Sequence, residues 1–476
     1  MKNFEQRIEN FGAEKIFIAV FLFFGLMILF MRPPYRLMDE PVHFARAWQI
    51  SEGIFLSPLK TQLPEKNFGW KNRSPEAATE KMYAASVPSS LVPDEFIFDI
   101  KEDSTLVKFS LDELKKFLSP PLNVNEREEG LIPNTGVYPP PTYFPQAVAA
   151  WLGRSLNLNA GIIFYLMGLS GLIFVASCVY WSMKFLPEAK PLIFLLAMLP
   201  MFLIEAASTS ADAVTFGVCF VGTAWLLSLR KSAEKFSHAE IFGLIILSIM
   251  LACSKSVYGT ILLLYFLIPR QRAGSLKKFL SLGAAILFLN LFVSLVWTEF
   301  ATAGTELATL RQYGGVEEVD FAAQKIFLAE HPTEFFSAMI YTFILSKFYY
   351  WFGFIGIWGA NGELYMSLLF YELYLIILIF FALTSGLKVK IFERGVLIFA
   401  AAVAAFAFFF VHYLKWTPVG ADYVKGVQGR YFIPIAPMIF TALSILPPMR
   451  HKNLIALVAG IFSGINMLLT NFSAFY

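Results

Sequence analysis

The sequence predicts an all-α membrane protein, a polytopic helical bundle that crosses the bilayer about eleven times and carries one large loop outside the cytoplasm. Hydrophobic residues make up 57% of the chain and charged residues only 15%, whereas soluble domains carry about a quarter charged residues. The net charge is only +3, and the basic residues form short clusters, so no nucleic-acid partner is expected. Composition therefore excludes a soluble fold and indicates that the chain is embedded in a lipid membrane.

Apolar runs long enough to cross a bilayer, at about 20 residues each, recur along the chain. They lie at 15–32, 160–186, 190–206, 211–229, 239–254, 257–269, 277–297, 367–386, 394–412, 432–447 and 453–470. The first run has no small-residue cleavage site and is followed by Arg32, so we interpret it as a retained helix rather than a signal peptide. Residues 333–358 are also apolar, but a crossing there would reverse the side of every later basic cluster. Their many aromatic residues favour an interfacial or re-entrant helix.

The positive-inside rule orients this bundle. A cytoplasmic N-terminus places four basic clusters inside: Arg230, Lys231 and Lys235; Arg270, Arg272, Lys277 and Lys278; Lys388, Lys390 and Arg394; Arg450 and Lys452. The chain then divides into a tail with the first helix (1–32), an extracytoplasmic loop region (33–157) and a multi-helix membrane domain (158–476), whose outer loops are 298–366 and 413–431. We expect an integral inner or plasma membrane protein with its active site on the extracytoplasmic side.

A cluster of ionisable residues follows the first helix on this outer side. Asp39 and Glu40 are adjacent carboxylates, and His43 and Arg46 follow within two turns. A carboxylate here could remove a proton from an acceptor hydroxyl. The alternative is structural, because Asp39 and Glu40 precede Pro41 and could cap the helix that begins there.

Three further polar groups lie at outer helix ends. Asp212 follows Ser208-Thr209-Ser210 and could orient a substrate or cap the next helix. Lys255, in Ser254-Lys255-Ser256-Val257-Tyr258, departs from the positive-inside pattern and could bind a lipid phosphate or extend to a headgroup. Arg430, in Gln428-Gly429-Arg430-Tyr431, could present its planar fork to a phosphate or pair with a nearby carboxylate.

Some types of site are not predicted. The three cysteines lie in apolar runs and show no metal-ligand spacing. No glycine-rich phosphate loop is present, so soluble nucleotides are not expected as substrates. We predict no metal or other cofactor, with a divalent cation at Asp39 and Glu40 left as an open alternative.

The chain resembles the GT-C class of polytopic glycosyltransferases, and within it the bacterial membrane family named domain of unknown function 2142. The resemblance spans most of the chain and rests on Asp39-Glu40-Pro41-x-His43-Phe44-x-Arg46, Tyr138 to Pro145, Ser210-x-Asp212-Ala213, Ser254-Lys255-x-x-Tyr258, Gly356-x-Trp358 and Gln428-Gly429-Arg430-Tyr431-Phe432-x-Pro434. Ala211 and Ser256 depart from the family pattern, where proline is expected.

This resemblance implies a glycosyltransferase that moves a sugar from a polyprenyl-phosphate donor to a cell-envelope glycan or glycolipid acceptor on the outer face. An inverting transfer would use Asp39 or Glu40 as catalytic base. The substrate-binding residues would be His43, Arg46, Asp212, Lys255, Tyr258, Gln428, Arg430 and Tyr431. A transporter or flippase of lipid-linked saccharides is the alternative, although its charges are expected nearer the midplane and in two related halves. A noncatalytic assembly protein is a third reading, in which the boundary carboxylates are replaceable.

Overall fold

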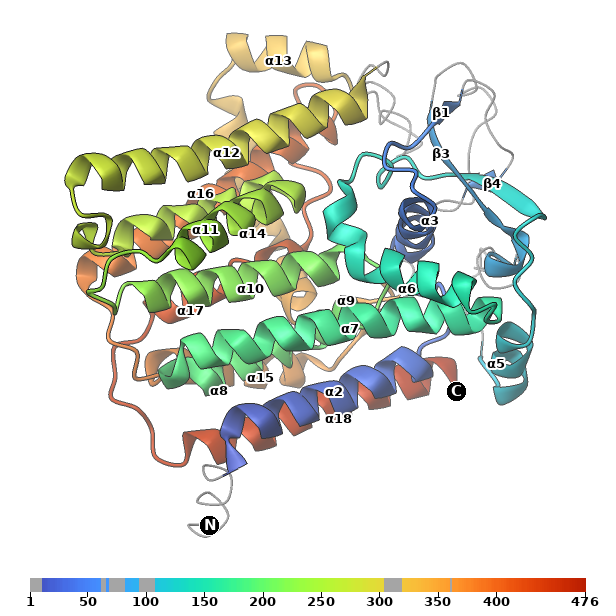
Figure 1. Ribbon diagram of the computed structural model, residues 1–476, viewed down its shortest axis with the longest axis horizontal. Helices are drawn as coiled ribbons and strands as arrows, with labels where there is room; N and C mark the ends of the chain where they lie inside the picture. Colours follow the sequence, from blue (N-terminus) through green and yellow to red (C-terminus); the bar gives the residue numbers. More distant parts are fainter. Residues whose placement is uncertain (1–10, 61–65, 68–81, 94–107, 304–318, 360–361) are drawn as a thin grey trace.

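Long apolar helices lie side by side and run between the two ends of the molecule (Figure 1). The computed structural model describes residues 11–60, 66–67, 82–93, 108–303, 319–359 and 362–476. The long helices of the bundle are α2 (Ala13–Met31), α7 (Ala160–Phe185), α10 (Ala211–Leu229), α12 (Leu276–Thr302), α16 (Ile391–Lys415) and α18 (Lys452–Phe475). The all-α polytopic fold that the sequence predicts is confirmed.

The predicted number of about eleven crossings exceeds the number of helices that are long and apolar enough to cross a membrane. In the described part of the chain, 7 helices could cross a membrane, or 8 if α8 (Lys190–Ala197) and α9 (Pro200–Ala206) form one bent span. Three predicted spans are shorter helices: α11 (His238–Cys253), the 3-10 helix η5 (Ser256–Leu267) and α15 (Leu368–Leu383).

The predicted span 432–447 is also wrong as a single helix. It contains the end of η8 (Gly429–Phe432) and the short helix α17 (Ala436–Ala442). Pro434 lies between them, and proline lacks the N–H that a continuous helix would use. The remaining short elements of this domain are η4 (Pro187–Ala189), η6 (Arg270–Ala273), α13 (Phe321–Glu330), β5 (Ile357–Trp358) and β6 (Leu364–Tyr365).

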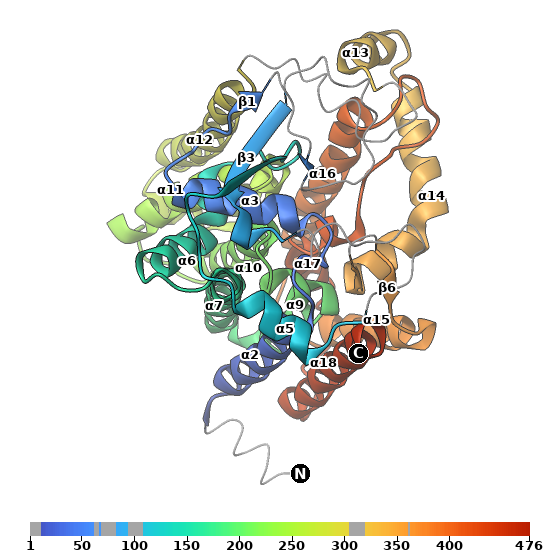
Figure 2. The same ribbon diagram turned by 90° about the vertical axis from the view of Figure 1, so that its right-hand side faces the viewer.

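Helix α14 (Glu334–Ile355) corresponds to the segment predicted to be interfacial. It is long and apolar enough to cross a membrane. However, it runs across the shared direction of α7, α10 and α12 (Figures 1 and 2). Phe335 and Tyr350 attach it to α16 through contacts with Phe409 and Tyr413. Its predicted interfacial position stays a prediction, because α14 is also one of the candidate spans.

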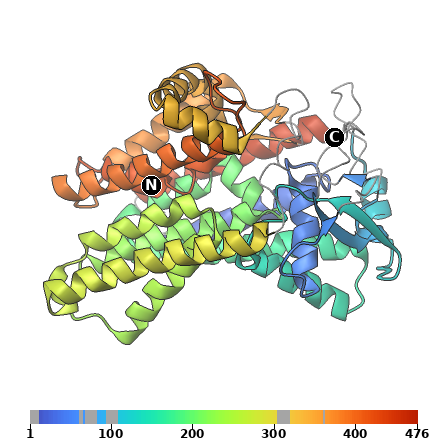
Figure 3. The same ribbon diagram turned by 90° about the horizontal axis from the view of Figure 1, so that it is seen from above.

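The described residues of the loop region 33–157 gather at one end of the bundle, which we call the loop end (Figures 1 and 3). Its described helices are α3 (Glu40–Ser51), which begins one residue before the predicted start at Pro41, η2 (Ser89–Leu91), α5 (Leu111–Leu118), η3 (Pro140–Tyr143) and α6 (Phe144–Ser155). A small sheet in the order β1-β3-β4-β2 was not predicted. Its strands are β1 (Leu59–Lys60), β2 (Lys66–Asn67), β3 (Met82–Pro88) and β4 (Arg127–Leu131); the antiparallel β3–β4 pair aligns Ser86 with Glu129.

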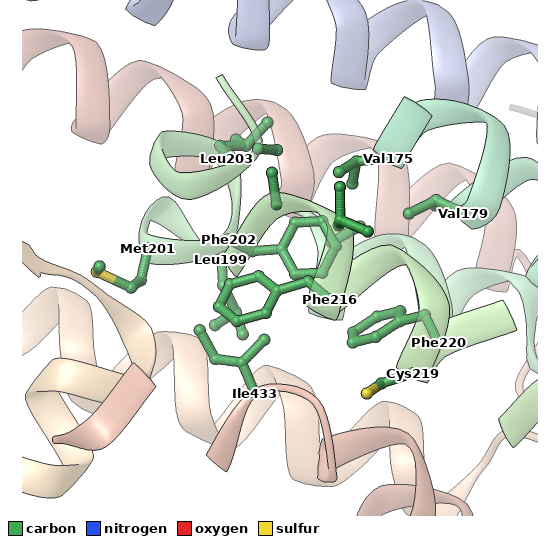
Figure 4. Close-up of a cluster of buried hydrophobic side chains, with 14 of the residues drawn as sticks. Val175, Val179, Leu199, Met201, Phe202, Leu203, Phe216, Cys219, Phe220 and Ile433 are labelled. Carbon is green, nitrogen blue, oxygen red and sulfur yellow. The ribbon is translucent and has the colours of Figure 1, made fainter. Parts of the chain in front are cut away.

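A cluster of buried hydrophobic side chains joins the elements that carry the polar side chains (Figure 4). Phe202 of α9 packs against Phe216 and Phe220 of α10, with ring centroids 5.4 and 4.9 Å apart. Ile433, directly after η8, reaches the same buried cluster. Close packing fixes these three elements relative to one another, which sets the positions of the charged residues that they carry.

Candidate functional site

Glu40, one of the two predicted bases, is held in an internal ion pair. Its side chain is fully buried, and both of its carboxylate oxygens accept hydrogen bonds from the Arg32 guanidinium, one of them at 2.8 Å from Nη2. Arg32 follows the last residue of α2, so this pair ties the end of α2 to the start of α3. Removing one partner would leave a buried charge uncompensated, so the pair acts as a structural connection.

Asp39 occupies the N-cap position of α3, but its side chain does not cap the helix. Its φ is +63°, in the left-handed region that non-glycine residues adopt at an energetic cost, whereas capping residues usually have extended backbone. The carboxylate turns instead toward Asn134 Nδ2 and Arg430 Nη2, each 3.2 Å away. The capping alternative is therefore wrong for Asp39, whose side chain remains 19% exposed.

Arg430 is the centre of a buried charge cluster at the loop end. Its Nη1 donates to Glu205 Oε1 at 2.6 Å, and its Nη2 donates to Asp39 Oδ2. Its Nε lies 3.6 Å from Asp212 Oδ2, too far for a hydrogen bond. One guanidinium thus faces three carboxylates that come from α9, α10 and the segment before α3.

Asp212 and Lys255 complete this cluster. Ser210 caps α10, because its Oγ accepts a hydrogen bond from the Asp212 backbone N–H at 3.1 Å, so the capping alternative for the Asp212 side chain is wrong. Lys255 Nζ lies 2.9 Å from Asp212 Oδ1 and 4.2 Å from the ring centroid of Tyr431, a cation–π contact. Burial alone would lower the pKa of Lys255, but the Asp212 carboxylate outweighs this effect and raises it.

The described charges of the cluster do not balance. Asp39, Glu205 and Asp212 are three carboxylates, whereas Arg430 and Lys255 are two cations. With all five groups ionised the net charge is −1, so an added anion would bind more favourably if one carboxylate moved away from its cation. Asp39 is the partner best placed to move, because it is the most exposed of the three and its contact with Arg430 is longer than that of Glu205.

His43 and Arg46 lie behind Asp39 on α3. His43 Nδ1 is 2.7 Å from the Tyr143 hydroxyl, and both side chains are buried. Arg46 is fully buried, and its guanidinium donates to the carbonyl oxygens of Ile54, Phe55 and Tyr138 at 3.2, 2.5 and 3.1 Å. Arg46 therefore joins residues 54–55 of the loop to Tyr138, which lies just before η3, as a positioning residue would; its predicted contact with substrate stays a prediction.

Burial lowers the pKa of His43 from 6.5 to about 4, against the opposing effect of Asp39 and Asp212. The unfolded chain takes up this proton near pH 6.5, so the stability from neutral His43 is present above pH 6.5 and is lost as the pH falls toward 4. We expect the free energy of unfolding to fall by about 2 kcal/mol more in wild type than in His43→Gln between pH 7 and pH 5. Chemical unfolding in detergent measures this difference. His331→Gln, at an exposed position, should keep the wild-type pH dependence, and equal slopes in wild type and His43→Gln would contradict the expectation.

A small pocket of about 70 Å³ lies beside Arg430. It is lined by Leu37, Met38, Met201, Tyr349, Gly353, Ile357, Trp358, Gly362, Gln428, Gly429 and Arg430. Gln428 Nε2 contacts Met38 Sδ at 3.4 Å, and the Tyr258 hydroxyl donates to the Tyr431 carbonyl oxygen at 3.1 Å. The predicted residues Gln428 and Arg430 thus line this pocket, while Tyr258 holds the backbone of Tyr431, the residue after Arg430.

Gly429 sets the position of Arg430 against α14. A Cβ at residue 429 would lie 2.5 Å from the Phe354 backbone nitrogen and even closer to the Tyr350 carbonyl oxygen. We expect Gly429→Ala to destabilise the fold by about 1–3 kcal/mol, the usual cost of overpacking, and to lower the thermal unfolding midpoint. Gly395→Ala is the matched control, because a Cβ there meets nothing within 4 Å. An unchanged midpoint in Gly429→Ala would contradict this packing.

The structure adds Glu205, Arg32 and Asn134, which sequence reasoning missed. Glu205 is a carboxylate within the apolar segment 190–206, and an ionisable residue at such depth is a signal of a functional site. Asn134 in the loop carried no comparable signal. Among the residues that the structure describes, no group of three or more His, Cys, Asp or Glu side chains is arranged to hold a metal ion.

Comparisons with known proteins identify the family of the chain. No curated protein and no solved structure matches the chain. Residues 22–439 match the model of a family described as predicted membrane protein, DUF2142. The match includes α3, the charge cluster and the small pocket. The chain therefore belongs to this family of membrane proteins, the domain of unknown function 2142 family.

Proposed function

We propose that the chain is a GT-C-type glycosyltransferase. It transfers a sugar from a polyprenyl-phosphate donor to a cell-envelope glycan or lipid-linked acceptor, with inversion at the anomeric carbon. The observation that carries this proposal is the partly exposed Asp39 carboxylate, which pairs with the buried Arg430 and belongs to the same charge cluster as the partly exposed Lys255. A general base next to phosphate-binding groups is what transfer from a sugar phosphate requires.

Donor binding exchanges one anion for another. A phosphate oxygen takes the place of the Asp39 oxygen that now lies 3.2 Å from Arg430 Nη2. Arginine suits this role because its planar fork matches phosphate geometry. Asp39 is released from the guanidinium and becomes available to the acceptor. Glu205 and Asp212 stay in place and keep Arg430 and Lys255 oriented.

The reaction is a single displacement at the anomeric carbon. The acceptor oxygen forms a bond to this carbon while its proton passes to Asp39. The bond from the carbon to the phosphate oxygen breaks, and the electron pair leaves with the polyprenyl phosphate. Arg430 and Lys255 stabilise the negative charge that grows on the leaving phosphate. Both carboxylate oxygens of Glu40 accept hydrogen bonds from Arg32, so Glu40 takes no part in proton transfer.

The distribution of charges supports an extracytoplasmic site. The basic cluster at Arg230 follows the last residue of α10 and the cluster at Arg270 precedes α12, and these ends of α10 and α12 lie opposite the loop end (Figure 1). The positive-inside rule assigns those clusters to the cytoplasm. Transfer then takes place on the extracytoplasmic face, where a lipid-linked sugar is the expected activated donor.

Purified protein incubated with a panel of labelled polyprenyl-phosphate sugars and envelope acceptors tests the proposal. We expect wild type to transfer sugar from at least one donor and Lys255→Met to do so about a hundredfold more slowly, because one charge that stabilises the leaving phosphate is lost. Lys115→Met, at an exposed position in α5, should keep the wild-type rate. Equal rates in wild type and Lys255→Met would remove Lys255 from the phosphate site.

One observation favours the transport alternative. The segments Pro187–Ala197 and Pro200–Ala206 meet at 81°, and the buried Glu205 belongs to the second of them. Broken helices with membrane-level charges are typical of secondary transporters. A flippase of lipid-linked saccharides would move the donor between leaflets without forming a glycosylated product.

A further inference from the structure

A second, larger cavity lies away from the charge cluster. Its volume is about 600 Å³, within the range of small-molecule binding sites. It is lined by Ile50, Ser51, Phe55, Pro140, Pro141, Phe144, Pro145, Ala147, Val148, Trp151, Phe174, Val214 and Met250. Twelve of these thirteen lining residues are apolar, so the cavity suits a hydrocarbon rather than a sugar or a phosphate.

The position of the cavity points to the membrane. Phe174, Val214 and Met250 belong to α7, α10 and α11, apolar helices of the bundle. The outer wall is α6, where Phe144 is 65% exposed and Trp151 is 51% exposed. A cavity between apolar helices, bordered by exposed aromatic residues, lies at the level where lipid chains meet their headgroups.

The guanidinium of Arg154 lies at the edge of this cavity. Arg154 Nη2 donates to the carbonyl oxygen of Ser51, a lining residue, at 2.8 Å. Among the described residues, the carboxylate nearest to Arg154 is that of Glu52 at 3.7 Å, and Arg127 already binds both oxygens of Glu52 at 2.9 and 2.8 Å. Two arginines therefore share this carboxylate, and Arg154 has no carboxylate within hydrogen-bond distance in the described part of the chain.

We infer that this cavity holds an acyl chain of an anionic membrane phospholipid, whose headgroup phosphate contacts Arg154. The apolar lining matches an acyl chain, but a chain that comes from the bilayer gains little hydrophobic free energy on entering the cavity. Close packing against the lining and the contact of the headgroup with Arg154 therefore have to hold the lipid. A charge-assisted hydrogen bond from Arg154 selects an anionic headgroup over a neutral one. The inference does not depend on the proposed glycosyltransferase activity.

The bound chain also supports the site behind it. Pro140 and Pro141 of η3 line the cavity, while Tyr143 of the same element contacts His43. Element η3 is therefore the wall between the lipid chain and the side chains next to Asp39. Filling the cavity holds this wall in position from the membrane side.

Native mass spectrometry of the purified protein in mild detergent tests the inference with phosphatidylglycerol and phosphatidylcholine as probes. Wild type should retain one phospholipid and prefer phosphatidylglycerol. Val148→Trp, which places a large side chain in the cavity, should lower retention about tenfold or more. Arg154→Gln should retain lipid but reduce the preference for phosphatidylglycerol about tenfold.

Matched controls place the same changes elsewhere. Val458→Trp lies on the exposed face of α18 and Arg270→Gln lies in an exposed turn, and both should retain lipid as wild type does. If Val148→Trp does not fold, phosphatidylglycerol with a photoreactive acyl chain should crosslink wild-type α6 rather than α18. Absence of a retained phospholipid, equal retention in the two tryptophan variants, or displacement by an equimolar polyprenyl phosphate would overturn the inference.

Discussion

Asp39→Asn is expected to reduce the rate of sugar transfer about a thousandfold, because a general base contributes roughly 10²–10⁴-fold to such reactions. Asparagine keeps the size of the side chain but cannot accept the proton of the acceptor hydroxyl. The fold should change little, since Asp39 is partly exposed and Arg430 retains Glu205. Initial rates at saturating donor, together with the thermal unfolding midpoint, measure the two effects separately.

Asp112→Asn is the matched control for this substitution. Asp112 lies in α5 with its side chain 89% exposed, and it pairs only with Lys115 among the charges described there. Its asparagine variant should transfer at the wild-type rate. Full activity in Asp39→Asn would show that another group accepts the proton, and Glu40→Gln would then be the next variant to measure.

Arg430→Gln is expected to have the largest combined effect. The variant loses a charge that stabilises the leaving phosphate, which lowers the transfer rate about a hundredfold or more. It also leaves Glu205 buried without its partner, a loss of roughly 3–5 kcal/mol in the free energy of unfolding. Initial rates measure the loss of transfer, and chemical unfolding in detergent measures the loss of stability.

A second substitution separates the two roles of Arg430. Adding Glu205→Gln to Arg430→Gln removes the uncompensated charge, so the free energy of unfolding should recover while transfer stays low. Arg270→Gln, at an exposed position, should change neither quantity. Recovery of transfer along with stability would mean that Arg430 is only a structural partner of Glu205.

Hydropathy predicts the long spans because each must bury about 20 apolar residues in the bilayer. It fails where an apolar run does not form a long α-helix. Residues 257–269 are as apolar as their neighbours, yet they form the 3-10 helix η5, and Pro434 breaks the run that follows η8. The small sheet was missed because β4 reads Arg127-Glu128-Glu129-Gly130-Leu131, without an alternating apolar pattern.

The charge cluster was partly predictable. Asp39, Asp212, Lys255 and Arg430 stand out because ionisable side chains at helix ends in a membrane need partners. The structure brings all four together. Which carboxylate pairs with which cation depends on distances in the folded chain, and the sequence does not give these distances.

Adjacent residues show this limit most clearly. Asp39 and Glu40 are equivalent candidates by residue type. In the structure, however, both oxygens of Glu40 accept hydrogen bonds from Arg32, whereas the side chain of Asp39 remains partly exposed. The left-handed backbone at Asp39, which turns its carboxylate away from the helix start, could not be anticipated from an Asp-Glu-Pro pattern. The same holds for Ser210, which caps α10 in place of Asp212.

The most direct test of the account uses proteoliposomes that contain wild type or Asp39→Asn, with a labelled polyprenyl-phosphate sugar in one leaflet and an acceptor on the same side. Product formation and movement of the donor to the other leaflet are measured in the same sample. A glycosyltransferase that uses Asp39 as its base should give labelled product with wild type, almost none with Asp39→Asn, and no donor movement with either. Donor movement without product would contradict glycosyl transfer and assign the charge cluster to transport.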